Sequence, residues 1–142
     1  MNTSTPNHAA FLSRLTLGIV LLAHGALKLF VFTIPGTVGF FASLGLPAAA
    51  AYLTIFAEVV GGLALIAGVY PRLIAILSLP VLAGASWAHL GNGWLFSNQG
   101  GGWEFPVLLL VLAVIVAIQG ADRFAIKRLP IVDKLVPALL KA

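Results

Sequence analysis

Charged side chains are scarce in this sequence. Of its 142 residues, only 8% are Asp, Glu, Lys or Arg, whereas 61% are hydrophobic, and the mean hydropathy is +1.08. A soluble globular domain carries about 25% charged residues. The low charge therefore excludes an ordinary water-soluble domain and indicates a protein whose main solvent is the lipid bilayer.

Cysteine is absent, which excludes thiolate nucleophiles, disulfide exchange and iron–sulfur ligation by this chain. The sequence also has no flavin or metal-binding motif, so we expect no metal site and expect any electrons to come from another protein. The formal net charge is +4, but most basic residues follow the last apolar run. That distribution is typical of the cytoplasmic flank of a membrane protein, and nucleic-acid binding is not expected.

Long apolar runs are abundant. Four of them cover roughly residues 11–32, 48–70, 73–90 and 105–121, and a membrane-spanning helix needs about 20 mostly apolar residues. We predict an all-α fold, with an integral membrane four-helix bundle over residues 1–124. The segment between the first two runs contains Phe40 and Phe41, which favours a place in the interface or a return into the bundle. A basic amphipathic tail over 125–142 is predicted to form a short interfacial helix.

The basic residues also predict the orientation. If the chain crosses four times, Arg14, Arg72 and the tail share one side of the membrane, whereas the loop at 91–104 has no Lys or Arg. By the positive-inside rule, both termini are then cytoplasmic. The glycine- and tryptophan-rich loop faces outward.

Five ionisable side chains fall in one polar layer in the outward half of the predicted bundle: His24, Lys28, Glu58, His89 and Glu104. Glu58 is surrounded by apolar residues, and a carboxylate at this depth costs at least about 2.5 kcal/mol unless it is paired, neutralised or hydrated. Gly61 and Gly62 allow a neighbouring helix to approach closely. We therefore predict that Glu58 faces the bundle interior, within hydrogen-bond reach of His24, Lys28 or both.

Each of these residues also has a purely structural interpretation. Lys28 can extend to the interface through its apolar stem, His89 can be an ordinary interfacial residue, and Glu104 can be a carboxylate favoured at a helix N-terminus. A Glu58–Lys28 pair can simply hold two helices together. The sequence leaves these alternatives open beside a ligand or proton site.

The loop before the last run combines Gly100, Gly101 and Gly102 with Trp103. We predict that it caps the polar layer, with Trp103 in the outer mouth and Glu104 at the lip near His89. An exposed loop anchored at the lipid headgroups is the alternative.

Several strings occur in a characteristic order: AHGALKLF at 23–30, FF at 40–41, LGLP at 44–47, AEVVGG at 57–62, YPR at 70–72, HLGNG at 89–93 and GGWEF at 101–105. Together, over roughly residues 12–124, they resemble the DoxX family. The resemblance implies a small four-helix inner-membrane protein, in a family named after a subunit of thiosulfate:quinone oxidoreductase. The resemblance also implies that the family's polar positions correspond to His24, Lys28, Glu58, His89, Trp103 and Glu104. The chain departs from the family pattern at 120–127, which ends basic where an aromatic and an acidic residue are common.

The favoured functional hypothesis is a redox-associated subunit that binds a quinone-like or other small ligand in an outer-leaflet pocket and acts with a soluble or peripheral redox protein. His24 and Lys28 would donate hydrogen bonds to quinone oxygens, while Glu58 with His89 or Glu104 would carry protons outward.

Three alternatives remain open at this stage. One is a proton-linked small-solute transporter, for which four helices leave little room unless the chain forms a homo-oligomer. Another is a membrane anchor or scaffold that docks on lipid or on a redox partner through its tail. Haem between His24 and His89 is a variant of the redox hypothesis that their different depths disfavour.

Overall fold

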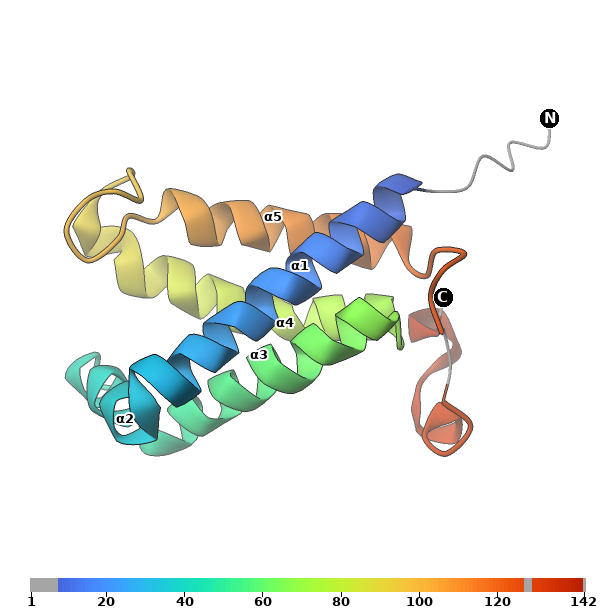
Figure 1. The fold of residues 1–142 in the computed structure, drawn as a ribbon, viewed down its shortest axis with the longest axis horizontal. Coiled ribbons are helices and arrows are strands. Elements are labelled where there is room, and N and C mark those ends of the chain that lie inside the picture. The colour runs from blue at the N-terminus through green and yellow to red at the C-terminus, as the bar shows by residue number, and fades with distance from the viewer. Residues whose placement is uncertain (1–7, 127–128, 142) are drawn as a thin grey trace.

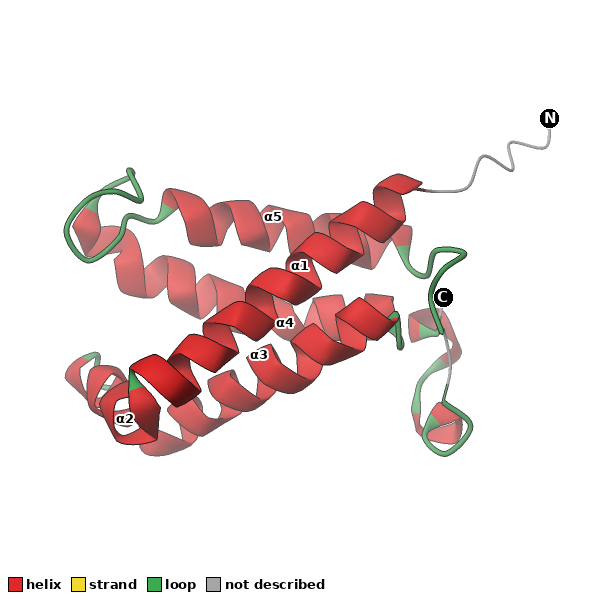
Figure 2. Cartoon of the chain, in the orientation of Figure 1, coloured by secondary structure: helices red, strands yellow, loops and turns green. Residues whose placement is uncertain are grey.

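The computed structural model describes residues 8–126 and 129–141 of the chain. Four long helices form a bundle (Figure 1): α1 (His8–Ala26), α3 (Ala48–Ala67), α4 (Pro71–His89) and α5 (Glu104–Gln119). The described part of the chain contains helices and loops but no strand (Figure 2). The predicted all-α membrane bundle is confirmed.

In the described residues, three segments are long and apolar enough to cross a membrane: His8–Val31, Ala48–Ala67 and Pro71–Asn92. Helix α5 is apolar but has only 16 residues, which is about 24 Å at 1.5 Å per residue. The start of α1 and the end of α5 lie at one end of the bundle, whereas the 93–103 loop lies at the other (Figure 1). Which end faces the cytoplasm stays a prediction.

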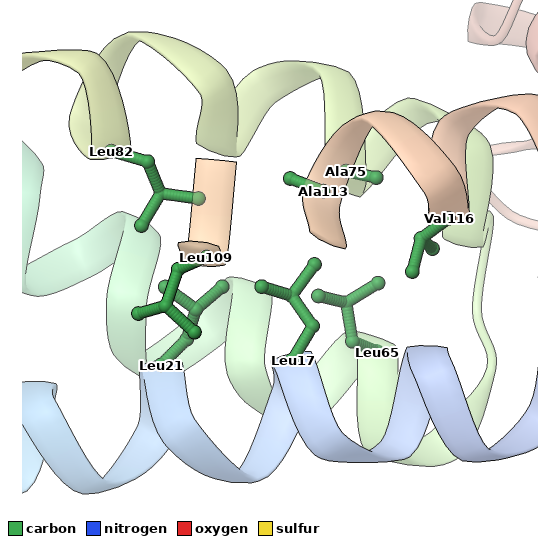
Figure 3. Close-up of a cluster of buried hydrophobic side chains, with 8 residues drawn as sticks. All are labelled: Leu17, Leu21, Leu65, Ala75, Leu82, Leu109, Ala113 and Val116. Atoms are coloured by element: carbon green, nitrogen blue, oxygen red, sulfur yellow. The ribbon is translucent and has the colours of Figure 1, made fainter. Parts of the chain in front are cut away.

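The core consists of aliphatic side chains from all four long helices (Figure 3): Leu17, Leu21, Leu65, Ala75, Leu82, Leu109, Ala113 and Val116. The outer faces of the same helices expose large apolar side chains, among them Leu53 and Leu108. Such an exterior suits contact with lipid acyl chains.

Helices α1 and α3 approach each other closely through glycine. A Cβ atom on Gly62 would lie 2.7 Å from the backbone nitrogen of Leu22, and one on Gly25 would lie 2.6 Å from the side chain of Val59. Small residues allow this kind of contact in membrane bundles. Gly61 is not part of it, because a Cβ there would meet Ile74 at an ordinary 3.5 Å. Of the two glycines predicted to allow a close approach of helices, Gly62 is therefore the one that does so between α1 and α3.

The segment between the first two long helices is itself helical. A π-helix, η1 (Leu27–Val31), continues α1, and a short α-helix, α2 (Thr33–Ser43), follows it at the same end of the bundle as the 93–103 loop (Figure 1). The sequence did not indicate a helix here because Pro35 and Gly36 are typical of a turn. Pro35 lies in the first turn of α2, where the backbone N–H that proline lacks would have no partner within the helix.

The C-terminal tail differs from the prediction. In place of an interfacial helix, residues 129–141 contain two short 3-10 turns, η3 (Asp133–Leu135) and η4 (Ala138–Leu140). Pro137 interrupts any longer helix, and the hydroxyl of Tyr70 donates to the Asp133 carboxylate at 3.0 Å. Three residues of the predicted basic tail, Lys127, Arg128 and Ala142, lie outside the described residues.

Candidate functional site

Lys28 projects from the π-helical turn at the end of α1. A π-helix is a wider turn than an α-helix and is frequent at functional sites. The hydroxyl of Thr37 in α2 has one proton to donate and lies 2.9 Å from the backbone carbonyl of Thr33 and 3.3 Å from that of Lys28. Thr37 is buried and therefore fixes the junction that carries Lys28. Sequence reasoning missed this residue, because nothing in the sequence shows that α2 folds against η1.

Glu58 of α3 forms an ion pair with Lys28. The Lys28 Nζ atom donates to Glu58 Oε1 at 2.8 Å, and the two side chains are 18% and 8% exposed, respectively. A Cβ on Gly25 would lie 3.2 Å from the Glu58 Cβ, so the close approach of α1 and α3 is what brings the pair together. The prediction that Glu58 faces the interior within reach of Lys28 is confirmed.

The second carboxylate oxygen of Glu58 has no hydrogen-bond partner among the described residues. Oε2 is buried, in contrast to Oε1, which accepts from Lys28. A buried acceptor without a partner costs about 1–3 kcal/mol.

A cavity of about 350 Å³ lies beside this pair, between α2, α3 and α4. Its volume falls in the range of about 300–1,000 Å³ that is typical of small-molecule sites. Four of its lining residues are polar: Lys28, Thr54, Glu58 and His89. The rest of the wall is apolar or glycine: Phe40, Phe41, Leu44, Leu46, Ala50, Leu53, Pro80, Val81, Gly84, Ala85 and Ala88.

His89 lines the cavity from the end of α4, and the following loop holds its ring. Its Nδ1 atom lies 3.1 Å from the carbonyl oxygen of Gly100 and 3.0 Å from that of Gly101. Because carbonyl oxygens only accept, Nδ1 carries a proton in this arrangement. Asn92 donates to the same two carbonyls at 3.0 and 2.9 Å. The loop therefore packs on the His89 ring through two backbone carbonyls.

The other three predicted site residues do not line this cavity. The Nδ1 atom of His24 lies 2.8 Å from the Val20 carbonyl, and its ring stacks on Phe105 at 5.8 Å. Trp103 packs edge-on against Trp94 with centroids 4.5 Å apart.

The carboxylate of Glu104 accepts from the backbone N–H of Phe96 at 2.8 Å. Glu104 lines a separate apolar groove along α5, with Phe105, Val107, Leu108 and Val111. The predicted lid of Trp103 with Glu104 at the lip is therefore not what the structure has. Position along a helix can be estimated from the sequence, but α5 is apolar on every side, so its sequence does not indicate which way it faces.

A second buried ion pair lies at the opposite end of the bundle. Arg14, 1% exposed, donates from Nε to Asp122 Oδ2 at 2.6 Å, and its Nη1 donates to the carbonyls of Leu65 and Ile66 at the end of α3. The Leu65 carbonyl also accepts from the backbone N–H of Gly68 at 3.1 Å. Both carbonyls belong to the last turn of α3, and a cation at a helix C-terminus is favourable. Arg14, predicted as a cytoplasmic flank, is a structural residue of the bundle.

Asp122 lies just beyond α5, and its pKa is set by two opposing effects. Burial raises the pKa, but the hydrogen bonds from Arg14 and from the backbone N–H of Phe124 outweigh it and hold the pKa below the ordinary value of 3.8. The sequence signal for this pair was an arginine inside an apolar run, which needs a partner wherever it is buried.

The DoxX family profile matches residues 9–91, more than half of the sequence. The chain belongs to the DoxX family. The matched segment runs from α1 to the end of α4, so it contains Lys28, Glu58 and His89 but ends before Trp103 and Glu104.

This DoxX protein is also similar to a chain from Bacillus subtilis (strain 168) named "Putative oxidoreductase CatD", with 31% identity over 115 residues that cover 81% of each chain. No solved structure matches it.

Proposed function

We propose that this DoxX protein is a redox-associated membrane subunit that binds a quinone-like or other small lipid-soluble ligand in the cavity between α2, α3 and α4. Lys28, Glu58 and His89 are its polar contacts. The observation that carries the proposal is the buried ion pair of Lys28 and Glu58, both of which line a cavity of ligand size in an otherwise apolar part of the bundle.

The chemistry of the wall favours an aromatic or otherwise apolar ligand. Phe40 and Phe41 contribute rings, and aliphatic side chains make most of the remaining surface. Phe40 and Leu53 are 50% and 67% exposed, so the wall reaches the outer surface of the bundle. A lipid-soluble molecule can therefore enter from the bilayer without crossing water.

The redox assignment rests on the site chemistry and on the comparison together. A quinone-like ring needs an apolar slot and a few polar groups, and a carboxylate and an imidazole are the groups that move protons when such a ring changes redox state. The similar Bacillus subtilis protein is named as an oxidoreductase. In the proposed role, a soluble or peripheral protein supplies electrons, while Glu58 and His89 hold or pass protons.

The predicted orientation completes the proposal. With both termini on the cytoplasmic side of the inner membrane, the cavity lies in the outer leaflet. His89 then joins the cavity to the outward loop through Gly100 and Gly101. Protons would leave on that side.

The test is to identify what the protein carries. The chain is purified from membranes in mild detergent, and lipid-soluble molecules are extracted and identified by mass spectrometry, beside Glu58→Gln and, as a matched control, Glu104→Gln. We expect a redox-active aromatic molecule with the unaltered chain and with Glu104→Gln, and about fivefold less with Glu58→Gln, which corresponds to losing about 1 kcal/mol. Equal amounts in all three samples would contradict the proposal.

A further inference from the structure

Gly84 differs from the other glycines of the four long helices. It lies within α4 and lines the cavity, and a Cβ atom added to it would meet nothing within 4 Å outside the backbone of α4 and its two neighbours in sequence. We propose that Gly84 determines how large a ring the cavity accepts, because the ring of the ligand packs against the backbone of α4 at this position. This inference rests on the proposed function and assigns a specificity-determining residue to the same cavity.

Helix packing does not explain glycine at this position. Only proline favours a helix less than glycine does, and the glycines between α1 and α3 have a packing reason for being there. A Cβ on Gly18 would lie 3.0 Å from the backbone oxygen of Gly62, and one on Gly25 would lie 2.6 Å from the Val59 side chain. Gly84 makes no such approach. Space for a ligand is a reason that fits its place on the cavity wall.

The direction of a side chain at position 84 follows from its neighbours along α4. Pro80 and Ala88 also line the cavity, and residues four apart lie about 40° from each other around an α-helix. Position 84 is therefore halfway between these two, and a Cβ added to Gly84 points to the same side of α4 as they do. Gly84 and Pro80 are both exposed, as expected where the cavity reaches the outer surface of the bundle. A larger side chain at position 84 would take up cavity volume.

The other walls leave α4 as the surface for the apolar body of the ligand. The ion pair of Lys28 and Glu58 comes from η1 and α3, and the rings of Phe40 and Phe41 come from α2. In Figure 1, α3 and α4 diverge toward the end of the bundle that carries α2. Gly84 allows the closest approach to the α4 backbone, since it has no side chain. In a cavity of about 350 Å³, a side chain at that point changes which rings fit.

Two quinones of different size test this directly. Tetramethylbenzoquinone has one ring and 2,3-dimethylnaphthoquinone has two fused rings, while both present the same pair of carbonyl oxygens. Each is titrated by calorimetry into the full chain in lipid nanodiscs, with protein-free nanodiscs as the blank. We expect Gly84→Leu to weaken binding of the two-ring quinone by about tenfold or more and that of the one-ring quinone by about threefold or less. Gly84→Ala should give smaller losses in the same order.

Gly39 supplies the matched control. It also lies within a helix, α2, is exposed and would place a Cβ with nothing within 4 Å, but it is not among the described residues that line the cavity. Gly39→Leu should bind both quinones as the unaltered chain does. Because alanine favours a helix more than glycine does, Gly84→Ala without added quinone should unfold at the same temperature as the unaltered chain or higher. Weaker binding without loss of stability is a result that a purely structural role would not give.

The outcomes separate this inference from the proposed function. If the unaltered chain binds the quinones and Gly84→Leu binds them as tightly as Gly39→Leu does, the specificity role is overturned while the ligand site stands. Equal weakening of both quinones by Gly84→Leu would also overturn it, since a general disturbance of the cavity does not depend on ring size. If the unaltered chain binds neither quinone, both proposals fall. The losses in Gly84→Ala give the answer even where Gly84→Leu does not fold.

Discussion

Lys28 and Glu58 form one buried ion pair. Replacing only one of them should therefore lower the free energy of unfolding by an amount that depends on which charge is left without a partner. Lys28→Met leaves a buried carboxylate without a partner, and breaking a buried pair in this way costs about 3 kcal/mol or more. Glu58→Gln keeps an amide oxygen for Lys28 and should cost about 1 kcal/mol. The double variant should be more stable than Lys28→Met alone, because the unpaired charge is gone.

Reversible unfolding in mixed detergent micelles measures these free energies. If the double variant lost as much stability as the two single changes added together, the coupling would be absent. The contact at 2.8 Å would then contribute nothing measurable.

The buried pair of Arg14 and Asp122 gives a pH dependence of defined sign. The pKa of Asp122 lies below its ordinary value of 3.8 in the folded protein, so the folded state binds the proton less readily than the unfolded state. The stability that Asp122 contributes is present above pH 3.8 and is lost as the pH falls through the lowered pKa. The free energy of unfolding of the unaltered chain should therefore decline as the pH is lowered from 5 to 3.

Asp122→Asn removes the titrating group and should flatten this part of the profile. It should also lower the free energy of unfolding at pH 7 by about 3 kcal/mol, because the buried Arg14 loses its counter-charge. A variant whose profile ran parallel to that of the unaltered chain would assign the acid sensitivity to another group.

At the scale of helices, the contact between α1 and α3 makes opposite predictions for two adjacent glycines. Gly62→Ala would place a methyl group 2.7 Å from the backbone of Leu22, so the helices must separate, at a cost of about 1–3 kcal/mol. Gly61→Ala meets only the Ile74 side chain at 3.5 Å and should be neutral or stabilising by up to about 1 kcal/mol. Gly62→Ala should also weaken ligand retention, since the same contact brings Glu58 to Lys28.

Thermal unfolding and co-purified ligand, measured on both variants, check this prediction. Equal loss of stability in Gly61→Ala and Gly62→Ala would show that helix flexibility matters and that the close approach does not.

The helices that could be predicted are those whose signal lies within their own stretch of sequence. The apolar runs locate α1, α3, α4 and α5, because a spanning helix must be apolar along its whole length. The π-helical turn at Leu27–Val31 could not be predicted, since it depends on the packing of α2 against η1. The tail was predicted as a helix from its pattern, but side-chain contacts from Tyr70 and Arg72 hold it in short turns.

The candidate site shows the same division. The depth of Glu58 and its need for a partner were evident from its apolar neighbours, and Lys28 is that partner. The directions in which His24 and Glu104 point depend on how each helix is rotated, which the sequence does not specify. Arg14 and Asp122 are 108 positions apart, and only the assembled bundle brings them together.

At the scale of the whole molecule, the basic residues predict which end faces the cytoplasm. The start of α1 and the end of α5 share one end of the bundle (Figure 1). An alkaline phosphatase fused after Ala142 should be inactive, because the enzyme folds only on the outer side, whereas a fusion within the 93–103 loop should be active. Activity after Ala142 would invert the orientation and move the cavity to the inner leaflet.

The central claim is that the cavity between α2, α3 and α4 holds a small aromatic ligand against Glu58. The most direct measurement is a crystal structure of the full chain with a brominated hydroquinone, in which the anomalous signal of bromine locates the ring. We predict a bromine peak inside the cavity and a ligand oxygen within about 3 Å of a polar atom of Lys28 or Glu58. Bromine bound only in the groove along α5, or an empty cavity at saturating ligand, would contradict the claim.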